Sequence, residues 1–161
     1  MSKCILSLVI FFLPVKDLRL KAQHLNPDSL KRVWTGARND TVKMIVSGKL
    51  ASYYAELNPD SSYRYANEML GIANRLNLPL ERAHALGASG YALINVGNYP
   101  RSLQILLTAA GLSEDPESEK NILPAYFEPS DEYTDRSADA RMQRLTRLSK
   151  ILQYLGILYS N

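Results

Sequence analysis

The fold is decided by residues 90–103, which read GYALINVGNYPRSL. Apolar residues recur at helical spacing up to Val96, and Asn98 then precedes a second apolar pattern with Pro100 at its start. Asparagine can cap the free N–H groups at the start of a helix, and proline is tolerated in the first helical turn, where its missing N–H costs nothing. The stretch therefore predicts the junction between two helices.

The same pattern occurs earlier in the chain, where Asn58 precedes a helix with Pro59 in its first turn. The two asparagines are 40 residues apart, and each follows an amphipathic helix that we expect at roughly 41–57 or 80–96. Short connections force consecutive helices to be antiparallel, and neither hairpin can bury its apolar face alone. We therefore predict an all-α fold of antiparallel helical hairpins stacked as a short α-solenoid.

The rest of the chain divides around these two hairpins. Residues 138–161 carry a strong stripe of leucine and isoleucine and predict the first helix of an incomplete third repeat. Residues 113–137 hold half of all acidic residues and three prolines, and they predict a loop insertion. The expected organisation is a signal peptide at 1–22, a lead-in at 23–40, hairpins at 41–79 and 80–112, the acidic loop at 113–137 and the third repeat at 138–161.

The N-terminus has the pattern of a secretory signal peptide. Lys3 is followed by an apolar run at 4–15, CILSLVIFFLPV, which is too short to span a bilayer comfortably, and we expect cleavage after Ala22. The alternatives are an uncleaved anchor and a buried helix. Export predicts a periplasmic or membrane-associated protein.

The charge balance depends on this cleavage. The full chain has 19 Lys and Arg and 16 Asp and Glu, and residues 1–22 hold four of the basic residues and one of the acidic ones. The remainder has 15 of each sign, so the basic character of the chain belongs to the signal peptide. We therefore expect no nucleic-acid partner.

No catalytic, metal or cofactor site is predicted. The two histidines, His24 and His84, lie in different elements, and the single cysteine, Cys4, makes neither a disulfide framework nor a zinc site. No glycine-rich phosphate loop occurs in the sequence. We therefore expect that the protein is not an enzyme.

Four basic residues lie three positions apart on the helix expected at 138–161: Arg141, Arg144, Arg147 and Lys150. They could form a cationic ridge for an acidic peptide or a phosphate. Charged runs usually solvate a helix, so we favour a solvated face that meets the acidic loop.

Residues 90–103 resemble a tetratricopeptide repeat. Gly90 matches the small residue where the two helices of a repeat touch, Gly97-Asn98-Tyr99 matches the Gly-Asp-Tyr turn, and Ser102 matches a small residue of the second helix. Small residues let helix backbones approach closely enough to pack at a fixed angle. The first repeat departs from this pattern, because Leu50 replaces the usual small residue.

A longer pattern, with DSL at 28–30, DTVK at 40–43 and NPDS at 58–61, resembles the exported sensor region of Bacteroidetes-type tetratricopeptide signalling proteins. In that family the repeats usually precede a membrane helix and a histidine kinase or a DNA-binding output domain. This chain ends inside its third repeat, so kinase activity is not expected of it. Membrane contact is expected only through a downstream region or an uncleaved N-terminus.

In tetratricopeptide repeats, ligands lie in the groove lined by the first helix of each hairpin. The resemblance therefore implies a protein or peptide partner bound by Tyr54 of the first repeat, His84, Tyr91 and Asn95 of the second, and Lys150 and Gln153 of the third. The same face would include Met44, Ser47, Gly87 and Ile94. The family's lysine–asparagine carboxylate clamp is absent, because Gly87 and Tyr91 occupy those places.

We therefore expect a non-catalytic protein- or peptide-binding module with a sensory or scaffolding role in bacterial signal transduction. The alternative is a truncated remnant of a larger tetratricopeptide histidine kinase, with no independent function. Helix 138–159 has an apolar stripe that cannot meet both of its neighbours, so it predicts self-association. The other way to cover the stripe is a folding back of the acidic loop, with its apolar residues Ile122, Leu123, Tyr126 and Phe127.

Overall fold

The computed structural model describes residues 26–123 and 139–161, and within these ranges all regular structure is helical. The signal peptide expected at 1–22 lies outside the described residues, as do Tyr126 and Phe127. The elements are α1 (Pro27–Gly36), α2 (Asp40–Tyr54), α3 (Pro59–Arg75), α4 (Pro79–Asn95), α5 (Tyr99–Glu114), the 3-10 helix η1 (Pro116–Lys120) and α6 (Ala140–Tyr159).

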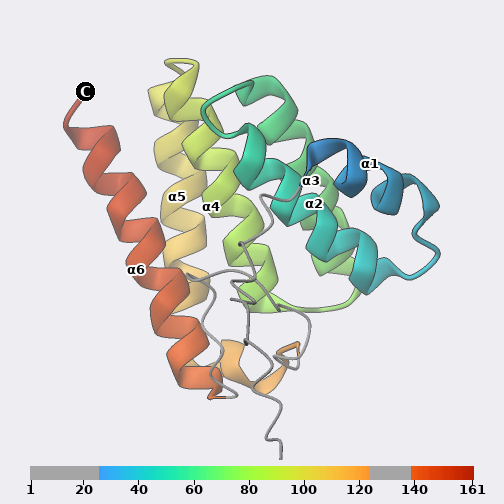
Figure 1. Ribbon diagram of the computed structural model, residues 1–161. Helices are drawn as coiled ribbons and strands as arrows, with labels where there is room; N and C mark the ends of the chain where they lie inside the picture. Colours follow the sequence, from blue (N-terminus) through green and yellow to red (C-terminus); the bar gives the residue numbers. More distant parts are fainter. Residues whose placement is uncertain (1–25, 124–138) are drawn as a thin grey trace, which may run out of the picture.

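Each helix packs against the one before it, so the array runs from α1 at one end to α6 at the other (Figure 1). Helices α2 and α3 form one antiparallel hairpin and α4 and α5 form the next, as predicted. Helix α6 contacts both α5 and α4, and α4 also contacts α2. The predicted all-α stack of helical hairpins is therefore confirmed, and α2, α4 and α6 come together on one side of it. None of the described helices has the length and apolar character that crossing a membrane requires.

The helix starts follow the local sequence in most places. Prolines occupy the first turns of α3, α4 and α5, and the side chain of Asn58 accepts a 2.9 Å hydrogen bond from the backbone N–H of Ser61. The capping role predicted for Asn98 is wrong, because its side chain makes no capping hydrogen bond. The preceding turn instead depends on Gly97, whose φ of 75° lets the Asn98 N–H reach the Leu93 carbonyl at 2.9 Å.

The segment expected as a lead-in at 23–40 contains α1, which covers the open end of the first hairpin. The Trp34 indole N–H donates a 2.9 Å hydrogen bond to the hydroxyl of Ser47, and its ring meets Tyr65 edge-on at 5.7 Å. Leu30 is buried in the same cluster. Helix α1 is therefore part of the core and seals one end of the stack.

The beginning of the segment predicted as an acidic loop is helical. Helix α5 continues to Glu114, and η1 then folds back so that the Ser118 hydroxyl donates to the carbonyl of Leu112 at 2.6 Å. Leu123 packs against the apolar cluster formed by α2, α3 and α4. Leu123 therefore does not cover α6, contrary to the alternative in which it helps to cap that helix.

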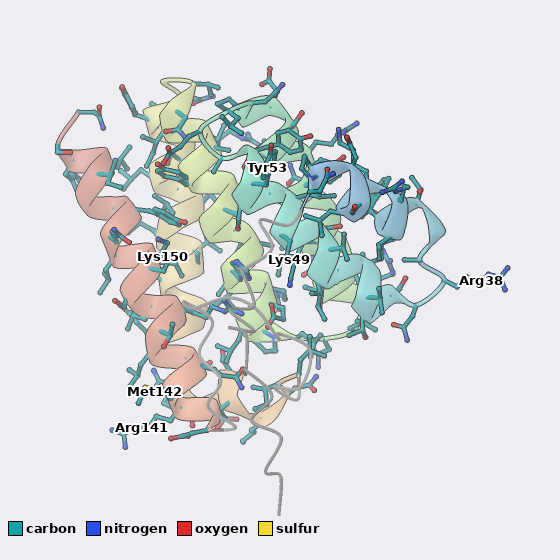
Figure 2. All side chains as sticks on the ribbon, in the orientation of Figure 1. Arg38, Lys49, Tyr53, Arg141, Met142 and Lys150 are labelled. Carbon is teal, nitrogen blue, oxygen red and sulfur yellow. The ribbon has the colours of Figure 1, made fainter. Side chains whose placement is uncertain are left out.

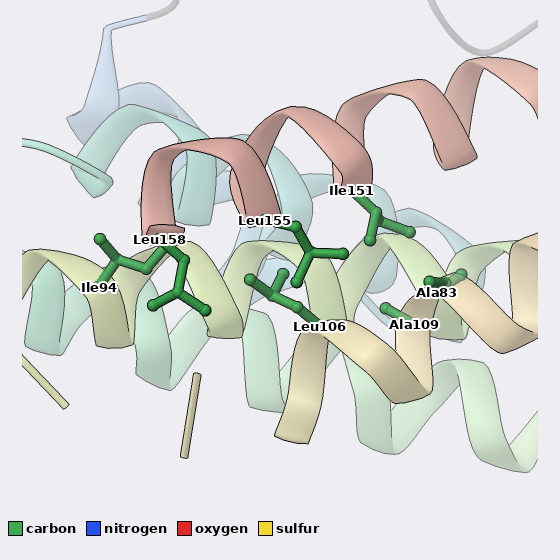
Figure 3. Close-up of a cluster of buried hydrophobic side chains, with 8 residues drawn as sticks. Ala83, Ile94, Leu106, Ala109, Ile151, Leu155 and Leu158 are labelled. Carbon is green, nitrogen blue, oxygen red and sulfur yellow. The ribbon is translucent and has the colours of Figure 1, made fainter. Parts of the chain in front are cut away.

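The stack closes around α6. Its buried residues Ile151, Leu155 and Leu158 pack into a cluster with residues of α4 and α5, among them Leu106 (Figure 3). Gly90 lies at the tightest point of the second hairpin, where an added Cβ would be 2.6 Å from Cγ of Leu106. The close approach of α4 and α5 predicted at Gly90 is therefore confirmed.

Candidate functional site

A groove of about 340 Å³ lies between the end of α2, the C-terminal part of α4 and the C-terminal half of α6. This volume is at the lower end of the range found for ligand pockets. The residues that line the groove are Ser52, Ala55 and Glu56 from α2 and the turn after it, Tyr91 from α4, and Lys150, Gln153, Tyr154 and Ile157 from α6.

Two stacked tyrosines line the groove between α4 and α6. The rings of Tyr91 and Tyr154 have centroids 4.6 Å apart and an interplanar angle of 17°. Gly87 lies beside this pair, and a Cβ added there would be in ordinary van der Waals contact with the Tyr154 ring, 3.8 Å from its Cε2. The pair therefore presents an aromatic surface that is held in place by packing between two helices.

Hydrogen bonding fixes the Tyr91 end of this surface. Its hydroxyl donates to Oε1 of Glu56 at 3.2 Å, which links α4 to the turn after α2. Burial and, as a smaller effect, the Glu56 carboxylate raise the pKa of Tyr91. Burial, followed by the neighbouring Tyr91 phenol, raises the pKa of Tyr154 to about 12. Both phenols therefore remain protonated at neutral pH and can donate hydrogen bonds.

The α6 side of the groove is exposed and polar. The ammonium of Lys150 (Figure 2) lies 3.2 Å from Oε1 of Gln153 and 5.3 Å from the centre of the Tyr154 ring. An amide, an ammonium and an aromatic face thus occur within one helical turn. Such a set can bind a peptide backbone through the amide and an apolar or aromatic side chain through the ring.

Asn95 lies beside the groove and joins the two hairpins. Its side-chain amide donates a 2.7 Å hydrogen bond to the carbonyl oxygen of Ala55, a residue that lines the groove and precedes Asn95 by 40 positions. The amide is thus bonded to the backbone of the preceding hairpin at the edge of the groove.

Two of the predicted binding residues lie elsewhere. The ring of Tyr54 stacks on Tyr65 at 6.0 Å and belongs to the packing of α2 against α3. His84 lies one turn from the start of α4, with its Nδ1 3.7 Å from Oε2 of Glu81. The structure thus brings Tyr91, Lys150 and Gln153 together in the groove and places Asn95 next to them.

Other residues assigned to the same face are part of the core. Met44 and Ser47 are fully buried, and Ile94 packs in the cluster of α4, α5 and α6. The sequence reasoning also missed Glu56 and Tyr154. Tyr154 follows Lys150 by four positions, so helical spacing alone could have placed it beside that residue.

The basic residues of α6 do not form one continuous ridge. Arg144 donates to Glu119 of η1 at 2.6 Å, so this residue does meet the acidic segment, as favoured above. Arg147 turns to α4 and lies 3.4 Å from Oε1 of Glu81. Lys150 lines the groove. Arg144, Arg147 and Lys150 thus lie in three different surroundings, and the prediction of one solvated face that meets the acidic loop is only partly correct.

Glu81 is a buried carboxylate at the start of α4. Burial raises its pKa, but the Arg147 guanidinium and then His84 outweigh burial and lower the pKa to about 2. Glu81 is therefore ionised at neutral pH and ties α6 to α4 below the groove. Among residues 26–123 and 139–161, no group of three or more His, Cys, Asp or Glu could hold a metal ion.

These features define an all-α array of helical hairpins with a groove on the side shared by α2, α4 and α6. Comparison with protein-family models, with curated proteins and with solved structures finds no match to this chain.

Proposed function

We propose that this chain is a tetratricopeptide-type binding module that holds an extended peptide segment of another protein in the groove between α2, α4 and α6. The observation that carries the proposal is the convergence of Tyr91, Lys150 and Gln153, chosen from the sequence as ligand residues, on that groove. The repeat pattern and the signal-peptide pattern further support a sensory or scaffolding role in an exported part of a bacterial signalling system.

The composition of the groove favours a peptide of mixed character. Tyr91 and Tyr154 offer an aromatic surface for one apolar side chain, whereas Gln153 offers both a donor and an acceptor to a peptide backbone. The groove carries one acidic side chain, Glu56, and one basic side chain, Lys150. A strongly charged tail of either sign would therefore meet repulsion at one end of the groove.

Selection of a displayed peptide library against the immobilised chain tests this proposal. Random linear peptides are selected, synthesised and titrated by calorimetry against the chain and its variants. Gln153→Ala and Lys150→Glu are expected to weaken binding about tenfold, which corresponds to about 1.4 kcal/mol.

The matched controls are Gln104→Ala and Lys120→Glu, which change exposed residues on α5 and η1 outside the groove lining. They are expected to leave the affinity unchanged. Selected peptides that bind all four variants equally, or a selection that enriches no peptide, would refute the proposal.

A further inference from the structure

The outer face of α6 carries a stripe of large apolar side chains that no described helix covers. Met142, Leu145, Leu152 and Tyr159 are 49%, 40%, 52% and 74% exposed. Figure 2 shows Met142 at the start of α6, on the side away from the other helices. Leu145, Leu152 and Tyr159 follow one another at intervals of seven, the spacing of a helix that packs along another helix.

Small residues occupy the positions between the large side chains of this stripe. Ser149 and Gly156 continue the seven-residue spacing of Met142, and both are exposed. A Cβ added to Gly156 would meet nothing within 4 Å. The outer face of α6 therefore alternates projecting side chains with open positions that could receive them.

The charges of α6 are divided between its two halves. All four basic side chains lie within residues 141–150, and residues 151–161 carry no charged side chain. Arg144 and Arg147 form ion pairs with Glu119 and Glu81, whereas Arg141 is exposed. Two parallel copies of α6 would bring the two Arg141 side chains close together, whereas two antiparallel copies place the basic half of each helix along the uncharged half of the other. The antiparallel arrangement also opposes the two helix dipoles, which is the favourable orientation.

We infer that two copies of this chain associate through the outer faces of α6, with the two helices antiparallel. One register places both exposed leucines of each copy opposite small residues of the other. In it, Leu145 lies against Gly156 of the partner subunit, and Leu152 lies against Ser149 of the partner subunit. Met142 then meets Tyr159 of the partner subunit at each end of the contact. The arrangement is a twofold, self-complementary interface, as most homodimers have.

Substitutions at two positions, Leu145 and Gly156, distinguish this register from nonspecific association of apolar surfaces. Gly156→Leu fills the position that receives Leu145 of the partner subunit, so it is expected to weaken dimerisation about tenfold or more. A nonspecific apolar contact would instead be strengthened by the added leucine. Leu145→Ala alone removes the projecting group and is also expected to weaken the dimer. The double variant Leu145→Ala with Gly156→Leu again pairs a large residue with a small one and is expected to restore the association.

The measurement is light scattering coupled to size exclusion on the full chain over a wide range of concentration. As the concentration increases, we expect the measured mass to rise from 18.1 kDa, the mass of one chain, to twice that value. Gly111→Leu is the matched control, because it adds the same group at an exposed, open position of α5 and should leave the dimer unchanged. Circular dichroism checks that each variant stays folded, which is expected since leucine forms helices better than glycine. A mass of 18.1 kDa at all concentrations, tighter association of Gly156→Leu, or a double variant weaker than both single ones would overturn the inference.

Discussion

The hydroxyl of Ser102 donates a hydrogen bond of 2.8 Å to the backbone carbonyl oxygen of Gly90 and thereby ties the start of α5 to α4. Ser62 makes the same bond, also 2.8 Å long, to the carbonyl oxygen of Ala51 between α3 and α2. Both serines are buried and lie 40 residues apart. In this contact the counterpart of Gly90 in the first hairpin is therefore Ala51, one position beyond Leu50, which the repeat pattern places there.

Removing either hydroxyl should loosen one hairpin. Ser102→Ala and Ser62→Ala are each expected to lower the free energy of unfolding by about 0.5–1.5 kcal/mol, because each loses one buried hydrogen bond. Thr108→Ala is the control, since the exposed Thr108 hydroxyl bonds to the Gln104 carbonyl within its own helix. Urea unfolding measures all three, and equal stability of Ser102→Ala and Thr108→Ala would contradict the expectation.

Gly90→Ala should destabilise the chain although alanine is the better helix former. The new Cβ would lie 2.6 Å from Cγ of Leu106, so α4 and α5 would have to move apart. The expected loss is about 1–3 kcal/mol. Gly111→Ala adds the same methyl group where nothing lies within 4 Å and should stabilise by about 0.5–1 kcal/mol. Thermal unfolding of the two variants should therefore shift in opposite directions.

Asn95→Ala should weaken the contact between the two hairpins. The substitution removes the 2.7 Å hydrogen bond to Ala55, and we expect a loss of about 0.5–1 kcal/mol because the pair is exposed. Amide hydrogen exchange should rise at the end of α2. Asn67→Ala is the control, since the Asn67 side chain bonds to the carbonyl of Tyr63 in its own helix. If exchange at the end of α2 rose in the Asn67 variant, or did not rise in the Asn95 variant, Asn95 would not be the residue that joins the two hairpins.

Arg147→Met should leave the buried Glu81 carboxylate without its guanidinium partner. The guanidinium lies 3.4 Å from Oε1 of Glu81, which is only 9% exposed, and its loss leaves a buried charge with weaker compensation from His84. We expect a cost of about 1–3 kcal/mol. Arg141→Met changes an exposed residue of the same helix and should cost little. Chemical unfolding compares the two, and similar stabilities would show that Glu81 does not depend on Arg147.

Acid should remove the stabilising effect of Glu81. Its pKa is about 2 in the folded chain and 4.5 when unperturbed, so the unfolded chain binds the proton first as the pH falls. The contribution of Glu81 is therefore complete above pH 4.5 and is lost progressively from there down to about pH 2. The free energy of unfolding should fall less steeply over this range in Glu81→Gln than in the unsubstituted chain, and parallel slopes would contradict the assignment.

The sequence by itself determined helices α2 to α6 and the two hairpins, whereas it did not predict α1 or η1. Proline in the first turn, the Asn58 cap and apolar residues at helical spacing act on the backbone within a few positions, so they can be recognised without knowledge of the rest of the chain. The close approach at Gly90 was also predictable, because the hairpin turn that follows forces α4 and α5 together. The predicted cap at Asn98 was wrong, since its side chain makes no capping hydrogen bond, and the turn after α4 has Gly97 at a φ of 75°.

The tertiary structure alone decided which faces meet. Periodicity shows that α6 has apolar residues, but only packing on α4 and α5 buries Ile151, Leu155 and Leu158 and leaves Leu145 and Leu152 outside. Likewise, Glu81 and Arg147 are 66 positions apart, and Tyr91 and Tyr154 stack across two helices. Such pairs depend on the angle at which α6 crosses α4, which is set by the summed shapes of many side chains and not by any local pattern.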